Sequence, residues 1–210
     1  DQFNYTCFDR EFINFKDQTI RQPMKSITGI GLLILMAISL PLRAGDDECS
    51  IRNTAFQAGE SITYRVYYTL AGVYIAAGEA TFSSVIEDLN GKPVYHVTGE
   101  GKTYPFYDNF FRVRDKYETF IDTATLQPYK FIRNVHEGTY KKYENVSFNK
   151  SASTAITNAG VFKTPGCIQD VISSMYYMRN LDFDNMQPGD KSPFSMFLDN
   201  QVYDLYIRYL

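Results

Sequence analysis

The chain has 210 residues, of which 21 are basic and 24 acidic, and its formal net charge is -3. Acidic and basic side chains are interspersed, so the sequence lacks the basic stripe that a phosphate backbone requires, and nucleic acid is not expected as a partner. The same charge balance does not favour an anionic lipid surface.

Residues 24–44 have the three-part layout of a secretory signal peptide. Lys25 precedes an apolar stretch from Ile27 to Leu40, and Ala44 ends a small-residue cleavage site. The apolar run of about 14 to 17 residues is shorter than the roughly 20 needed to cross a bilayer. We therefore expect export through the inner membrane to the periplasm or the cell exterior, with no stable membrane span after cleavage. The alternative is a retained N-terminal membrane anchor at 27–42.

The position of this segment divides the chain. Met24-Lys25 resembles an ordinary start of a secreted bacterial protein. We therefore interpret residues 1–23, which precede it, as upstream translation rather than as a domain. Residues 45–210 are long enough for one domain with a proper core. Residues 201–210 alternate like a strand with no turn after them, so we expect this single β-rich domain to be incomplete at its C-terminus.

From Phe56 onward, apolar residues recur with a period of two, which is typical of half-buried strands. Asn90-Gly91 accepts the positive φ angles of a tight hairpin turn. The expected strands are 60–70, 73–87, 94–103, 113–121, 129–135, 140–148, 154–157, 194–198 and 202–209. Such a long antiparallel meander must curl into a barrel-like or two-layer sheet to bury its apolar face. The predicted fold class is therefore mainly β.

One segment, at about residues 167–179, has helical spacing instead. Ile168, Val171, Ile172 and Met175 recur at intervals of three and four, and Pro165 stands where a first helical turn tolerates proline. We expect this helix to pack on an open end or face of the sheet.

Two cysteines, Cys49 and Cys167, follow the expected cleavage site. An oxidising compartment permits a disulfide between them. Two separate thiols, or pairing with a cysteine beyond this sequence, are equally compatible with the spacing. A catalytic cysteine needs a base, and nothing local places His96 or His136 beside either one.

The most aromatic segment is a single loop between two expected strands. It carries Tyr104, Phe106, Tyr107, Phe110 and Phe111. These rings are suited to the mouth of a lipid or glycan pocket. Alternatively, the loop caps the end of the sheet with its own side chains. Because tyrosines also spread evenly along the strands, the second interpretation is favoured.

Carboxylates are the other candidates for chemistry. Glu79 and Glu118 could contribute to the acid pair that glycoside hydrolysis requires. Carboxylates on the wet face of a sheet are more often ordinary cross-strand partners of lysine or arginine. His96 and His136 have no helical metal-binding spacing, and no glycine-rich phosphate loop occurs, so no metal or other cofactor is expected.

Several short motifs follow one another along the chain. They are Gly59-Glu60 with Tyr64 and Tyr68, residues 77–80, residues 115–118 with Asp122, residues 126–128, Glu137-Gly138, and Asp170 with Tyr177 and Arg179. In this order the chain resembles secreted bacterial proteins of domain-of-unknown-function family 3108, particularly members from Bacteroidetes. The resemblance covers about residues 56–210 and implies further strands beyond this sequence. It implies no function and no catalytic residues.

Two classes of function remain. The favoured hypothesis is a noncatalytic envelope protein that binds a hydrophobic or cell-surface ligand, with a lipid or glycan as the expected partner. The alternative is an enzyme that acts on envelope polysaccharide with carboxylate and tyrosine side chains. A purely structural adaptor is a third hypothesis.

Overall fold

The computed structural model describes residues 49, 51–70 and 73–210. The interpretation of residues 1–23 as upstream translation, the signal peptide at 24–44 and the alternative anchor at 27–42 all lie outside these residues. In the described part of the chain, no helix has the length and apolar character that crossing a membrane requires.

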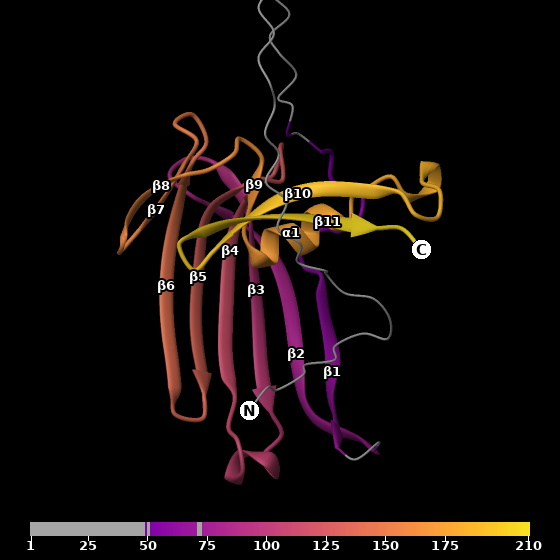
Figure 1. Ribbon diagram of the computed structural model, residues 1–210. Coiled ribbons are helices and arrows are strands. Elements are labelled where there is room, and N and C mark those ends of the chain that lie inside the picture. Colours follow the sequence, from indigo (N-terminus) through magenta and orange to yellow (C-terminus); the bar gives the residue numbers. More distant parts are fainter. Residues whose placement is uncertain (1–48, 50, 71–72) are drawn as a thin grey trace, which may run out of the picture.

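The main layer is one antiparallel sheet of eight strands in sequence order (Figure 1). Its strands are β1 Ser61–Leu70, β2 Val73–Asp88, β3 Pro93–Thr103, β4 Arg114–Asp122, β5 Pro128–Glu137, β6 Tyr140–Asn149, β7 Thr154–Thr157 and β8 Gly160–Lys163. The mainly β class and the meander are thus confirmed. The sheet is not closed into a barrel, because β1 and β8 lie at opposite ends of the strand order.

A second layer crosses one end of this sheet (Figure 1). It consists of the helix α1 Val171–Met178 and a small sheet in which β10 lies between β11 and β9. The bounds of its strands are β9 Ile168–Gln169, β10 Lys191–Leu198 and β11 Gln201–Arg208. Two 3-10 turns, η1 Tyr107–Asn109 and η2 Phe183–Asn185, complete the elements.

The helix begins later than residue 167, and the reason is its cap. The Asp170 carboxylate accepts hydrogen bonds of 2.8 Å from the backbone N–H groups of Ile172 and Ser173. The Ser173 hydroxyl in turn accepts from the Asp170 N–H, which completes a capping box. Ile168 and Gln169 pair instead with β10 as a short parallel strand.

The core lies between the two layers, at the end of the large sheet that we call the covered end. Phe131 of β5 and Phe197 of β10 are each 1% exposed. Ile172 of α1 belongs to the same cluster. The Thr119 hydroxyl of β4 donates a 2.6 Å hydrogen bond to the buried Asp170 carboxylate, which joins the helix cap to the sheet. The packing is thus mainly apolar, and this hydrogen bond is a polar connection within it.

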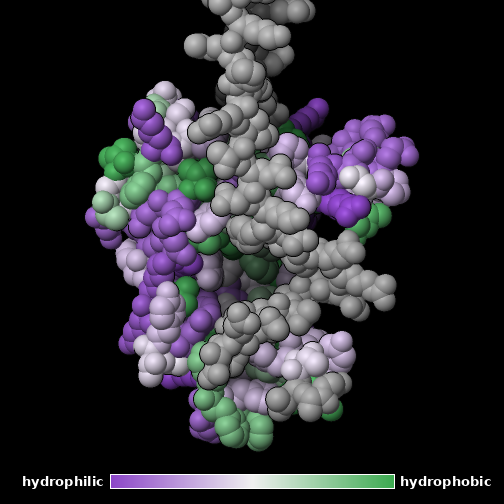
Figure 2. Space-filling model, in the orientation of Figure 1, coloured by the Kyte–Doolittle hydropathy of each residue, from purple (hydrophilic) through white to green (hydrophobic). Residues whose placement is uncertain are grey.

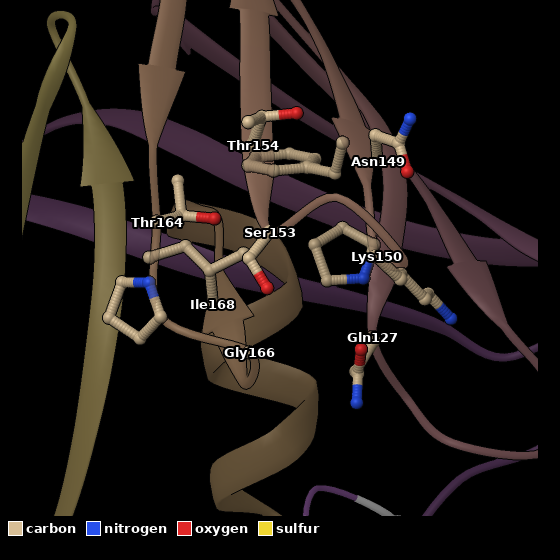
Figure 3. Close-up of a pocket in the computed structure, with 11 residues that line it drawn as sticks. Gln127, Asn149, Lys150, Ser153, Thr154, Thr164, Gly166 and Ile168 are labelled. Carbon is tan, nitrogen blue, oxygen red and sulfur yellow. The ribbon is translucent and has the colours of Figure 1, made fainter.

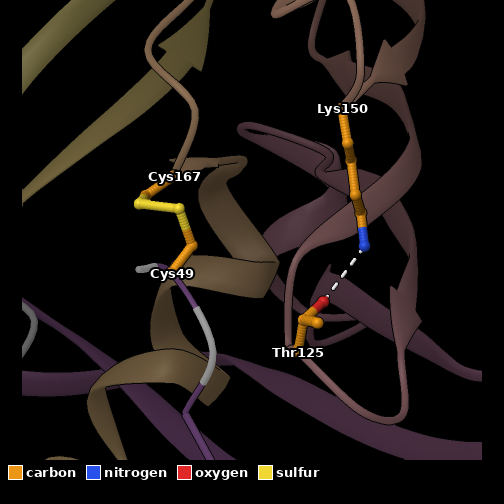
Figure 4. Close-up of a disulfide and its surroundings, with 4 residues drawn as sticks. All are labelled: Cys49, Thr125, Lys150 and Cys167. Atoms are coloured by element: carbon orange, nitrogen blue, oxygen red, sulfur yellow. Dashed lines mark hydrogen bonds between the residues drawn. A yellow bond between two sulfur atoms is a disulfide. The ribbon is translucent and has the colours of Figure 1, made fainter. Parts of the chain in front are cut away.

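Cys49 and Cys167 form a disulfide, shown in Figure 4. It connects residues 118 positions apart in the sequence and fixes Cys49 beside the loop that precedes β9. Nearby, the Lys150 ammonium donates a 3.0 Å hydrogen bond to Thr125 (Figure 4). Of the alternatives that the sequence left open, the structure contains the pairing between these two cysteines.

Two tight turns have the backbone that their residues favour. Asn90 and Gly91 have φ angles of 56° and 81°, and Asp199 and Asn200 have 52° and 61°. Two consecutive positive φ angles characterise the type I′ hairpin. The Asn-Gly turn between β2 and β3 therefore agrees with the sequence prediction.

Candidate functional site

An antiparallel meander places alternate turns at the same end of its sheet. The connections β1–β2, β3–β4 and β5–β6 therefore meet at the end opposite the covered one, which is the lower end in Figure 1. We call this end the tip and define it by Val73, Tyr74, residues 104–113 and residues 138–141.

Backbone hydrogen bonds fix the aromatic loop of the tip. The N–H of Tyr107 donates to the Tyr104 carbonyl, and those of Phe110 and Phe111 both donate to the Tyr107 carbonyl, each at 2.9 Å. The Tyr104 N–H donates to the carbonyl of Ala77 in β2, also at 2.9 Å. The loop is therefore anchored within itself and to the neighbouring strand.

A charged side chain inside the loop adds a second anchor. Asp108 of η1 accepts two hydrogen bonds from the Arg114 guanidinium, at 2.5 and 3.0 Å. It also accepts one of 2.6 Å from the Thr103 hydroxyl. These hydrogen bonds lower the pKa of Asp108, and the bond from Arg114 has a larger effect than the bond from Thr103. This pair closes the base of the loop between β3 and β4.

The rings themselves divide into two groups. Tyr104 and Tyr107 are half-buried. Phe106 and Phe110 are 70% and 78% exposed, although they contact each other with ring centroids 6.0 Å apart. Figure 2 shows hydrophobic side chains at the lower end of the molecule, where Figure 1 places this loop. The expectation that the loop buries its own rings is therefore wrong for these two phenylalanines.

The β5–β6 turn supports the loop from the side. The Gly138 N–H donates a 2.8 Å hydrogen bond to the Arg112 carbonyl. Gly138 has a φ of +60°, and a Cβ atom there would lie 3.0 Å from the Phe111 ring. Both features favour glycine at this position. Phe111, 45% exposed, therefore lies against the turn.

Basic residues gather next to the rings. Register pairs Lys102 with Arg114 and His136 with Lys141. Because Lys116 pairs with Asn134 in the same ladder, Arg114 and His136 are adjacent, and these four residues share one row. A recess of about 330 Å³ is lined by Arg112, Arg114, His136, Gly138 and Lys141. We call it the basic recess.

The two carboxylates that the sequence singled out lie apart. Glu79 forms an ion pair of 3.0 Å with Lys102. Glu118 accepts from His96 at 3.2 Å and pairs with Lys116 at 3.0 Å. Their partners on β3, Lys102 and Thr98, are four positions apart. This corresponds to about 13 Å along the strand.

The two histidines also lie apart. His96 stacks on Phe120 with centroids 4.3 Å apart, and Phe120 pairs with Lys130. Six positions along β5 separate Lys130 from His136, which is about 20 Å. Among the described residues, no group of three or more His, Cys, Asp and Glu side chains is placed to hold a metal ion.

A smaller cavity lies at the covered end, between the β6–β7 turn and the loop before β9 (Figure 3). Gln127, Lys150, Thr164 and Ile168 are among the residues around it. Its volume of about 10 Å³ is close to the minimum for one water molecule. It therefore has no room for an organic ligand.

The sequence prediction missed the basic half of the tip. Arg112 and Arg114 directly follow the aromatic loop, and Lys141 follows the β5–β6 turn. The strand order that the sequence predicts already places these turns at the same end. Combining that order with the positions of the basic residues would have found the recess.

Fold and site together define a β-rich protein with a two-layer core at one end of an open meander and an aromatic, basic tip at the other. The family model described as "Protein of unknown function (DUF3108)" matches residues 63–210. The chain belongs to this family, which confirms the resemblance at the level of the family. No curated protein and no solved structure matches the chain.

Proposed function

We propose that this protein is a noncatalytic protein of the cell envelope that binds a hydrophobic or cell-surface ligand through its tip. The observation that carries the proposal is the exposure of Phe106 and Phe110, at 70% and 78%, on a loop with a fixed backbone. Apolar rings held in water by an ordered loop are ready to bind, because little further ordering is needed. Exposed apolar patches of this kind mark interaction sites.

The envelope location rests on two observations. Residues 24–44 have the layout of a signal peptide. The disulfide between Cys49 and Cys167 suits an oxidising compartment such as the periplasm or the cell exterior.

The enzymatic alternative has less support from the positions of the acids. Acid pairs in glycoside hydrolases lie about 5 to 10 Å apart. The rows of Glu79 and Glu118 are separated by about 13 Å along the strand. Glu118 is also paired with Lys116 and His96. We therefore expect E118Q to leave ligand binding unchanged.

A neutral apolar dye, N-phenyl-1-naphthylamine, tests the proposal without involving charge. The double variant F106A/F110A should bind it at least tenfold more weakly, because burying each ring contributes roughly 1.5–3 kcal/mol. The matched control is F183A, which removes a 37% exposed phenylalanine from η2 in the second layer. Equal dye affinity in the double variant and the parent protein would contradict the proposal.

A further inference from the structure

The tip presents two chemistries side by side. Phe106 and Phe110 extend from the loop into solvent, and the basic recess begins at Arg112, two residues after Phe110. Phe111 lies between them and packs on Gly138 at the edge of the recess. A ligand whose apolar part contacts the rings could therefore place an anionic part within reach of the basic side chains.

The charge of the recess is only partly neutralised. Arg114 is paired with Asp108. Within the described part of the chain, neither Arg112 nor Lys141 forms an ion pair and both are exposed, although Arg112 lies near enough to Asp108 to help lower the pKa of that carboxyl. The neighbouring acids Asp115 and Glu137 alternate with Arg114 and His136 along their strands. They therefore point to the opposite face of the sheet.

We propose that the tip docks onto the surface of an anionic membrane, with Phe106 and Phe110 inserted among the lipids and a lipid phosphate bound in the basic recess. This inference rests on the proposed function and names its ligand class. Arginine binds phosphate oxygens with two parallel N–H donors, and lysine adds a compact charge.

The shape of the tip favours a membrane over a single enclosed lipid. The two phenylalanines protrude at the end of the sheet and are more than two-thirds exposed, so the described residues do not enclose them in a pocket. Val73 and Tyr74, 61% and 73% exposed, lie at the same end. Aromatic and apolar side chains beside basic ones are typical of segments that lie in a membrane interface.

The net charge of -3 does not oppose this contact. Electrostatic attraction at physiological ionic strength acts over about 8 Å. The charges that count are those at the tip, where Arg112 and Lys141 form no ion pair among the described residues, Asp108 is paired with Arg114, and Asp115 and Glu137 lie on the opposite face of the sheet. Distant acids along the sheet are screened.

Vesicles of phosphatidylcholine, with and without about one-third phosphatidylglycerol, provide the test. The 210-residue sequence contains no tryptophan, so F110W places a single tryptophan at the tip, whose emission can be excited selectively over that of the 17 tyrosines. We expect its emission to shift to the blue with the anionic vesicles, and the shift to diminish in high salt. Adding R112Q/K141Q should weaken this binding about 25-fold, at about fivefold for each basic residue.

A matched control removes the same charges elsewhere. K163Q/R208Q replaces one exposed lysine in β8 and one exposed arginine in β11, and it should leave vesicle binding unchanged. Equal weakening by both double variants would contradict a specific role of the recess. Circular dichroism and the thermal midpoint verify that each variant is folded.

Three further outcomes separate this inference from the function it rests on. Dye binding without any vesicle binding would overturn membrane docking and leave the proposed function intact. Equal binding to neutral and anionic vesicles would overturn the anionic headgroup. Competition by millimolar inorganic phosphate would agree with a lipid phosphate in the basic recess, whereas binding of inorganic phosphate by a protein that binds no vesicles would assign the recess to the free anion and overturn docking on lipid.

Discussion

The two ends of the large sheet use the same residue type in opposite ways. At the covered end, Phe131 of the large sheet and Phe197 of the second layer are each 1% exposed and belong to one buried cluster. At the tip, Phe106 and Phe110 are 70% and 78% exposed. The difference shows that phenylalanine at one end stabilises the fold, whereas at the other it is available to a partner. The predictions that follow test this division.

The largest effect is expected from F131A. Removing a fully buried ring at the covered end should lower the free energy of unfolding by about 3–5 kcal/mol, because transfer and cavity terms add. F110A, at the tip, should change it by less than about 0.5 kcal/mol. Urea denaturation of both variants measures the contrast. Comparable losses would contradict the division between the two ends.

The next effect is expected from the disulfide at the covered end. C49S/C167S opens a connection between residues 118 positions apart. Constraining the unfolded chain over such a loop typically contributes about 2–4 kcal/mol. Denaturation of the double variant should show this loss, while the dye affinity of the tip stays unchanged. Weakened dye binding together with native stability would indicate that the two ends are coupled.

The smallest effect concerns the buried carboxyl of Asp170. Burial raises its pKa from 3.8 to about 6, so the folded protein binds the proton more tightly than the unfolded chain. Stability from this group is therefore greatest below pH 3.8 and falls as the pH rises to about 6.

Two substitutions separate the charge of Asp170 from its capping role. D170N keeps a good N-cap side chain and cannot ionise, so it should remove this part of the pH dependence. D170A loses the cap and should cost about 1–2 kcal/mol. Urea midpoints measured from pH 4 to pH 7 test both. A D170N profile parallel to that of the parent protein would refute the assignment of the pH dependence to Asp170.

Much of the fold could be predicted because its signals are local. The alternation in β1 to β6 and the Asn90-Gly91 turn are visible in short windows, and their positions agree with the structure within a few residues. The start of α1 at Val171, the strand β8 and the two-residue strand β9 were missed. The helix start depends on a cap, and β9 depends on pairing with β10.

The sequence predicted the aromatic part of the candidate site but not its basic part. The aromatic loop is evident from composition, but the exposure of Phe106 and Phe110 depends on which surfaces the rest of the chain covers. Arg112 and Lys141 are 29 positions apart in the sequence and share one recess only after β4, β5 and β6 have paired. Long-range register is not encoded in any single segment.

The sequence by itself determined the meander order of β1 to β7, the hairpin turns and the presence of the helix α1, because backbone alternation, glycine conformations and helical spacing act between near neighbours. The tertiary structure alone decided which end of the sheet is covered. It also decided that Cys49 pairs with Cys167 and that the basic residues of three strands meet beside exposed rings. These features depend on contacts between segments that are distant in the sequence, and only packing selects them.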